Sequence, residues 1–231
     1  MTALVVKLIA VSSMLVDHTG AVFDLHFGFR IIGRIAFPLF VYLIAQSCRH
    51  TRSMEKYLIR LGIFAIISQI PFDMAFNDYI SFTSSTNIFY TLWLGVLCVY
   101  IFQSLYGYSQ KGNYIWILSA IPVTAAMMAA DWVGSDFGGR GVLFVFFVAI
   151  AGYIKFSGFV KYIQFAIMAV FMFWLYLPSA SLVIGGLSAV VIAGMMDTSK
   201  ASKPYAWTKW IFYFVYPVHL LVLALVNIFI D

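Results

Sequence analysis

Charged residues are scarce in this chain, and that scarcity argues against most classes of soluble protein. Asp, Glu, Lys and Arg make up 10% of the 231 residues, whereas soluble domains average about 25%. Hydrophobic residues make up 63%, and apolar stretches of roughly the 20 residues that a bilayer-spanning helix needs recur along the sequence. We therefore expect an all-α, polytopic integral membrane protein in contact with membrane lipids, and no nucleic-acid partner.

Cysteine and the common catalytic motifs are also nearly absent. Cys48 and Cys98 have no CxxC spacing, so we expect free, inert thiols rather than a disulfide framework. The chain contains no GxxxxGK[ST], HExxH, GxSxG or metal-type Cys/His spacing, which leaves NTP hydrolysis, zinc proteolysis, serine nucleophiles and a bound metal without support. The first apolar run lacks an A-x-A cleavage site and is expected to stay as a helix.

The apolar runs predict about nine transmembrane helices, with a range of eight to ten. We find no linker, low-complexity segment or internal repeat, so residues 1–231 are expected to form one domain. The predicted spans are 3–23, 31–47, 58–73, 88–106, 114–131, 141–157, 162–177, 182–196 and 209–229.

Basic residues predict the orientation of these spans. The densest cluster, Arg49, Arg52, Lys56 and Arg60, lies between the second and third spans. The positive-inside rule makes this loop cytoplasmic, together with the N-terminus. The same threading puts seven lysines inside, namely Lys7, Lys111, Lys155, Lys161, Lys200, Lys203 and Lys209, and leaves Arg30, Arg34 and Arg140 in the outer half.

The stretch from Lys7 to Tyr42 places ionisable groups in or against apolar helices. A charge near the bilayer centre costs between about 2.5 and 17 kcal/mol, so such groups pair, line a wet cavity or do chemistry. His18 can act as a general base near neutral pH, or it can be a packed histidine. Asp17 points to a different helix face from its neighbour His18, and we expect it to pair with Arg30 or Arg34. Structural pairing and anion binding are both open for these arginines.

Other polar residues are candidates for supporting roles. Lys7 lies eleven residues before His18 and returns to nearly the same helix face, although it can equally be a routine cytoplasmic lysine. The basic loop suits phosphate groups, and membrane topology alone also explains it. Candidates for polar support of a reaction are Asn87, Thr91, Asp136, Tyr216 and His219, the last two flanking Pro217.

Several sequence blocks together resemble the TraX family. They are MLVDHTGAVF, RIIGRIAFPLFVYLIA, RHTRSMEKYLIRLGIFAIISQIPFD, NIFYTLWLG, DFGGRGV and FYFVYPVHL, which run from the first span to about His219. The archetypal member acetylates the N-terminus of conjugative pilin. More distantly, the chain is similar to heparan-α-glucosaminide N-acetyltransferase and to bacterial membrane O-acyltransferases.

The resemblance implies a transmembrane acyltransferase-like bundle in the bacterial cytoplasmic membrane. Acetyl-CoA would enter from the cytosol, and a protein N-terminus or a glycan would be reached from the other side. By the same resemblance His18 is the catalytic histidine, Asp17, Arg30 and Arg34 form its polar setting, and the Arg49–Arg60 loop faces CoA. We count Asp17 with His18 as a catalytic candidate, and Lys7, from its spacing on the helix, with the loop as a cofactor-binding candidate. Direct transfer and an acetyl-histidine intermediate both remain open, as does the oligomeric state.

Three other functions compete with this expectation. One is a surface-polysaccharide O-acyltransferase. Another is a proton-coupled secondary transporter with Asp17, His18, Asp136 and His219 as its relay, although the paired repeats of many transporters are not visible. A third is a non-enzymatic assembly subunit in which the charges lock helices together.

Overall fold

The computed structural model describes residues 1–77, 79–108, 114–153, 159–196 and 208–230. Four of the lysines predicted to be cytoplasmic are not among these residues, namely Lys111, Lys155, Lys200 and Lys203. Within it the secondary structure is α-helical apart from turns and one isolated bridge between Thr86 and Ser135. The helices are α1 (Ala3–Val22), α2 (Gly28–Gly33), α3 (Ala36–His50), α4 (Met54–Phe76), α5 (Ile88–Tyr108), α6 (Tyr114–Trp132), α7 (Gly138–Ala151), α8 (Val160–Tyr176), α9 (Ala180–Gly194) and α10 (Thr208–Ile230).

These helices agree in position with the predicted spans, with two differences. Helix α7 ends at Ala151, whereas the sixth span was expected over 141–157, of which 154–157 lie outside the described residues. The second span, expected as one helix over 31–47, is broken into α2 and α3 at Arg34 and Ile35. Pro38 supplies the physical reason. It has no N–H to donate to the carbonyl of Arg34, four residues earlier, and its ring would clash with that carbonyl in a continuous helix. At the break, the backbone of Arg34 and Ile35 forms a turn instead of continuing the helix.

Length and composition support the membrane assignment. Five segments are long and apolar enough to cross a bilayer, namely Ala3–Val22, Gly28–His50, Met54–Phe76, Ile88–Tyr106 and Trp210–Ile230. On α4, Ile59, Ile63, Ile66 and Ile70 repeat on one face and are exposed, as a lipid-facing stripe requires. The protein is therefore an all-α membrane protein. Four further apolar segments, Ile117–Trp132, Gly138–Ala151, Val160–Tyr176 and Ala180–Gly194, are shorter, and their crossing stays a prediction.

The chain divides into two compact units built from non-consecutive segments. Unit 1 contains Met1–Leu43, Ile70–Ile80 and Phe165–Asp231, and unit 2 contains Ile44–Gln69 and Ser81–Gln164. Helices α3, α4 and α8 contribute residues to both units. The expectation of a single domain stays a prediction.

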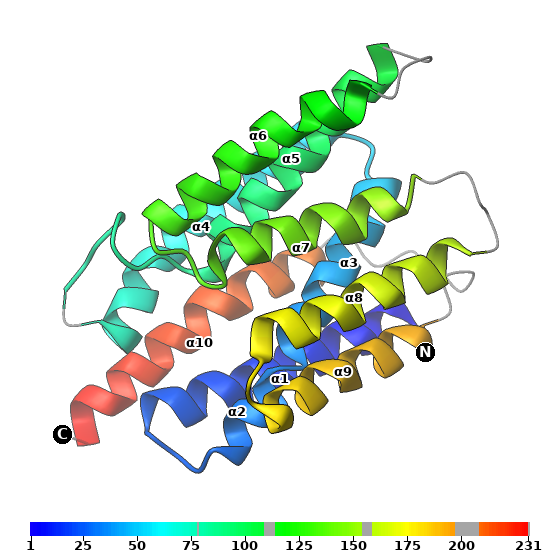
Figure 1. Cartoon of the computed structure of the whole chain (residues 1–231). Helices are drawn as coiled ribbons and strands as arrows, with labels where there is room; N and C mark the ends of the chain where they lie inside the picture. The colour runs from blue at the N-terminus through cyan, green and yellow to red at the C-terminus, as the bar shows by residue number, and fades with distance from the viewer. Residues whose placement is uncertain (78, 109–113, 154–158, 197–207, 231) are drawn as a thin grey trace. The chain divides into compact units, whose positions relative to one another are not determined.

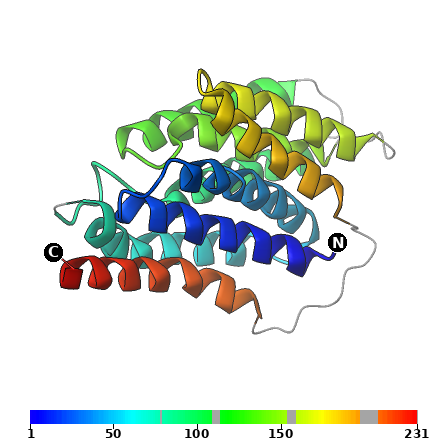
Figure 2. The same ribbon diagram turned by 90° about the horizontal axis from the view of Figure 1, so that it is seen from below.

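In unit 1, α1 packs against α2 and α10, and α2 packs against α9. Figures 1 and 2 show α1 and α10 side by side and running in the same direction. The α2–α9 contact is close because Gly185 has no side chain: a Cβ there would lie 2.3 Å from the carbonyl oxygen of Ile31. Unit 1 therefore brings the first and last helices of the chain together.

In unit 2, α5, α6 and α7 pack against one another. Their interior is apolar, with Val96, Phe102 and Phe144 at most 1% exposed. At Gly95 of α5 a Cβ would lie 2.6 Å from the Cβ of Val145 on α7. The close approach at this glycine permits the dispersion contacts that drive helix association in lipid.

Candidate active site

A pair of histidines joins the first and last helices of unit 1. The Nδ1 of His18 on α1 lies 2.7 Å from the Nε2 of His219 on α10, within hydrogen-bond distance. The other nitrogen of His219, Nδ1, lies 2.7 Å from the carbonyl oxygen of Val215. Both histidines are partly exposed, so the pair lies at the edge of the packed core rather than inside it.

Aromatic rings surround this pair. Tyr216 makes edge contacts with both rings, with centroids 5.8 Å from His18 and 5.6 Å from His219. Phe76, near the end of α4, meets His18 edge-on at 5.5 Å. The two imidazoles themselves are nearly parallel, with an angle of 15° between the rings. These ring contacts restrict the orientation of the His18 imidazole. Its Nδ1 atom faces His219, and its other nitrogen, Nε2, takes no part in the pair.

Asp17 forms ion pairs with both arginines, which confirms the pairing expected from the sequence. One oxygen, Oδ1, lies 3.1 Å from Nη1 of Arg30 and 3.4 Å from Nη2 of Arg34. One carboxylate between two guanidinium groups leaves one positive charge in excess. The carboxylate of this cluster belongs to the residue directly before His18 on α1.

The two arginines differ in their surroundings. Arg34 is 13% exposed, donates from Nε to the carbonyl of Arg30 at 3.2 Å, and lies over the ring of Tyr176 at 5.5 Å. Arg30 is 38% exposed, and its ion pair engages one of the five N–H groups that a guanidinium carries. Arg34 is therefore fixed in the packing, whereas Arg30 keeps donors available for another anion.

Two features of the local sequence permit this ion-pair cluster. Gly33 lies directly against Asp17, since a Cβ on Gly33 would lie 2.1 Å from Oδ1. Ser13 donates its hydroxyl to the carbonyl of Ile32 at 2.5 Å, which satisfies a backbone acceptor near the break between α2 and α3. A glycine and a small hydroxyl residue thus let α1 approach the end of α2 closely.

Lys7 lies on the same side of α1 as His18, as predicted. Its Nζ is 5.2 Å from the ring centroid of Phe212 on α10, so both residues contact α10. A cation over an aromatic face is stabilised by about 0.5–1 kcal/mol at exposed sites. This contact gives Lys7 a packing role in addition to any role towards a ligand.

Asn87, Thr91 and Asp136 belong to unit 2 and have structural partners there. Asn87 donates to the carbonyl of Ala65 at 2.8 Å and to Oε1 of Gln69 at 2.9 Å, and its Oδ1 accepts from the N–H of Phe89. These bonds satisfy a fully buried amide and cap the start of α5.

The hydroxyl of Thr91 donates to the backbone oxygen of Asp136 and lies 3.1 Å from the hydroxyl of Ser135. The backbone N–H of Asp136 in turn donates to the carbonyl of Thr86 at 3.0 Å. These contacts tie the segment before α5 to the turn before α7. The expected polar support for a reaction stays a prediction for these residues.

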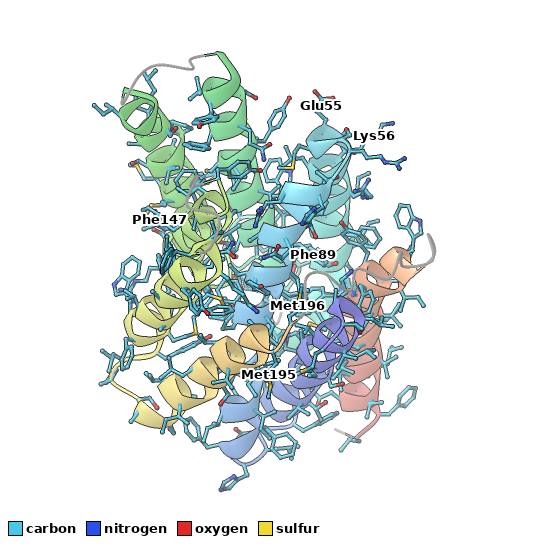
Figure 3. All side chains as sticks on the ribbon, turned by 90° about the vertical axis from the view of Figure 1, so that its right-hand side faces the viewer. Glu55, Lys56, Phe89, Phe147, Met195 and Met196 are labelled. Atoms are coloured by element: carbon cyan, nitrogen blue, oxygen red, sulfur yellow. The ribbon has the colours of Figure 1, made fainter. Side chains whose placement is uncertain are left out.

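The basic cluster lies where α3 ends and α4 begins, in unit 2. Arg49, Arg52 and Lys56 are exposed, and Figure 3 shows Glu55 and Lys56 at the start of α4. Glu55 accepts a hydrogen bond from the hydroxyl of Tyr100 at 3.0 Å. Arg60 lies over the ring of Tyr57 at 5.7 Å. The exposed cations of this loop can meet an anionic ligand.

Arg49 has a packing partner within the same unit. A Cβ on Gly152 would lie 2.7 Å from its Cδ, which places the side chain against the C-terminal end of α7. A cation there is favoured by the helix dipole. Arg49 therefore stabilises α7, whereas Arg52 and Lys56 are the members of the cluster most accessible to a ligand.

The structure adds residues that sequence reasoning missed. Phe76 and Tyr176 contact His18 and Arg34, and neither carries a polar signal that distinguishes it from other aromatic residues. Val215 contributes only its carbonyl, which spacing could have indicated because it precedes His219 by one helical turn. In the described residues no group of three or more His, Cys, Asp or Glu side chains could hold a metal ion.

Comparison with known proteins places these residues in a family. The family model described as TraX protein matches residues 3–227. A curated relative, the probable fimbrial assembly protein FimC, serogroup H1, of Dichelobacter nodosus, is 30% identical over 143 residues. The aligned part covers 57% of this chain and 57% of the relative. No solved structure matches.

Asp17→Asn should destabilise the protein, because it leaves two arginines without their anion. We expect a loss of about 3 kcal/mol, the lower end for buried pairs, since Arg30 retains access to solvent. Unfolding of the detergent-solubilised protein measures it. Asp24→Asn is the matched control, as Asp24 is exposed at positive φ, which Asn tolerates. Equal stability of the two variants would contradict the structural role of the ion pairs.

Proposed function

The chain belongs to the TraX family, and on that premise we propose that it is an integral-membrane acetyltransferase. It moves an acetyl group from acetyl-CoA to an amine or hydroxyl group. The observation that carries the proposal is the His18–His219 pair, placed beside an ion-pair cluster with one excess positive charge. A neutral histidine next to a cation suits acyl transfer, which needs a proton acceptor and stabilisation of an oxyanion.

In this proposal His18 removes the proton of the acceptor as the acceptor attacks the thioester carbonyl. Negative charge then develops on the carbonyl oxygen. Arg30 stabilises that charge, because it is the more exposed arginine and has donors available. Asp17 and Arg34 hold Arg30 in place and are positioning residues.

We propose that the acceptor is the N-terminal amine of a pilin-like protein. Two observations support it: the family match, since the archetypal TraX protein acetylates pilin, and the relative described as a probable fimbrial assembly protein. A surface glycan is the second candidate acceptor. An amine must lose a proton during acylation, which is the step that His18 serves.

For the donor we propose that the phosphates of acetyl-CoA bind the basic cluster at the start of α4. Arg52 and Lys56 are exposed, and guanidinium and ammonium groups form charge-assisted hydrogen bonds to phosphate. This assignment agrees with a cytoplasmic location for the loop, because acetyl-CoA is a cytosolic metabolite. The protein would then lie in the bacterial cytoplasmic membrane with its N-terminus inside.

Cysteine labelling tests this orientation. Met54→Cys should react with an impermeant thiol reagent only after cells are opened, whereas Leu25→Cys, after α1, should react in spheroplasts. The parent protein is the background control, because Cys48 and Cys98 are buried. Labelling of Met54→Cys in intact spheroplasts would overturn the orientation.

Reversing the two exposed cations should weaken donor binding. We expect the double variant Arg52→Glu/Lys56→Glu to bind acetyl-CoA at least about tenfold more weakly, because one hydrogen bond to a charged group contributes about 1.5–3 kcal/mol. Isothermal titration with acetyl-CoA measures the affinity. Arg140→Glu, an exposed cation outside the cluster, is the control. Unchanged affinity in the double variant would place the phosphate site elsewhere.

Removing His18 should abolish transfer without abolishing donor binding. His18→Ala should lower the rate of acetyl transfer about 10²–10⁴-fold, the usual contribution of a general base, and bind acetyl-CoA within a few-fold of wild type. The assay combines radiolabelled acetyl-CoA with peptide amines and sugar acceptors. His26→Ala is the control, as His26 is exposed.

Retention of more than a tenth of the wild-type rate in His18→Ala would return His18 to a packing role.

A proton-coupled transporter is the second candidate function, because a hydrogen-bonded histidine pair also suits proton movement. Absence of any transfer, combined with uptake into liposomes driven by a pH gradient, would favour it.

A further inference from the structure

We propose that His219 is a positioning residue that sets the tautomer of His18, so that Nδ1 of His18 carries the proton and Nε2 presents the lone pair to the acceptor. This inference rests on the proposed transferase function and deepens it. It names the atom of His18 that takes the proton, and it assigns His219 a role that acts through His18 rather than through contact with either substrate.

The chain of hydrogen bonds fixes the tautomers by elimination. The carbonyl oxygen of Val215 can only accept, so Nδ1 of His219, 2.7 Å away, must be the donor. In a neutral imidazole the other nitrogen is then an acceptor. Nε2 of His219 therefore accepts from Nδ1 of His18, also 2.7 Å away. It follows that Nε2 of neutral His18 carries no proton.

The position of His219 on α10 makes this chain of bonds possible. Val215 and His219 are four residues apart, so the ring reaches back over one helical turn to that carbonyl. The edge contact with Tyr216, at 5.6 Å, holds the ring from the side. Helix α10 thus presents an acceptor atom to α1 in a fixed orientation.

The transfer step can be written with atoms and charges balanced. Nε2 of His18 takes the proton from the acceptor amine or hydroxyl while the acceptor atom forms its bond to the carbonyl carbon. The positive charge on His18 is then delocalised over a ring whose Nδ1–H already donates to His219. The C–S bond breaks, and Nε2 returns the proton to the departing CoA thiolate. On the acetyl-histidine route the same lone pair attacks the carbonyl carbon and the C–S bond breaks to release the CoA thiolate. The acceptor then attacks the acetyl group, the bond to Nε2 breaks, and the proton of the acceptor passes to the thiolate.

Two variants of His219 separate this role from simple packing. Gln places an amide oxygen near the position of Nε2 and can accept the hydrogen bond of His18, whereas Phe keeps the ring and removes the acceptor. We expect His219→Gln to retain a substantial part of kcat and His219→Phe to lose at least about tenfold, up to the 10²–10⁴ of a lost base. KM for both substrates should change by less than a few-fold in either variant.

A packing role predicts the opposite order. Phe preserves the ring contacts with His18 and Tyr216, so a residue needed only for packing would tolerate Phe better than Gln. Unfolding of both variants in detergent gives the control for stability. His219→Phe with wild-type kcat, or with more activity than His219→Gln, would overturn the inference.

Nitrogen-15 NMR of histidine-labelled protein reads the tautomer without using activity. His18, assigned by the signal lost in His18→Ala, should carry its proton on Nδ1 in the wild type, and the selectivity should disappear in His219→Phe. A proton on Nε2 of His18 would contradict the inference even if the protein transfers acetyl groups. The expected tautomer in a protein that transfers nothing would instead contradict the proposed function.

Discussion

The packing of α2 against α1 in unit 1 depends on one oxygen atom, Oδ1 of Asp17, which forms ion pairs with two guanidinium groups in a predominantly apolar helix bundle. Burying a charge without a partner costs several kcal/mol, so this carboxylate stabilises the packing of α2 against α1. Pro38 breaks the helix after Arg34, and the 3.1 and 3.4 Å contacts of Oδ1 to Arg30 and Arg34 hold the end of α2 against α1. That break turns the arginines towards the helix carrying His18.

The sequence predicted the helices well and the contacts between distant helices only in part. Long apolar runs indicate burial in lipid directly, which explains why most helix boundaries agree with the predicted spans to within four residues, the end of α7 and the break at Arg34 being the exceptions. The Asp17 pairing was also predictable, because few opposite charges were available nearby. The partner of His18 was not, since a pairing between residues 201 positions apart depends on which helices become neighbours, and hydrophobicity does not encode that.

The structure gives hydrogen-bond partners to two other residues that the sequence offered as candidates, Asn87 and Thr91. Asn87 and Thr91 are polar among apolar neighbours, which is the pattern of a functional residue and also of a buried structural bond. The bonds of Asn87 to Ala65 and Gln69 give it a structural role at the start of α5, and its expected support of a reaction stays a prediction. A single sequence cannot distinguish these two uses, because both require the same polar atom in the same apolar setting.

The contact between Gly33 and Asp17 constrains how this protein can change over evolutionary time. Since any side chain at position 33 would occupy the space of the carboxylate, the two positions cannot vary independently. A substitution at Asp17 would in turn favour loss of an arginine at position 30 or 34. We therefore expect these positions to be inherited as one set, whose members are exchanged together or retained together when related sequences diverge.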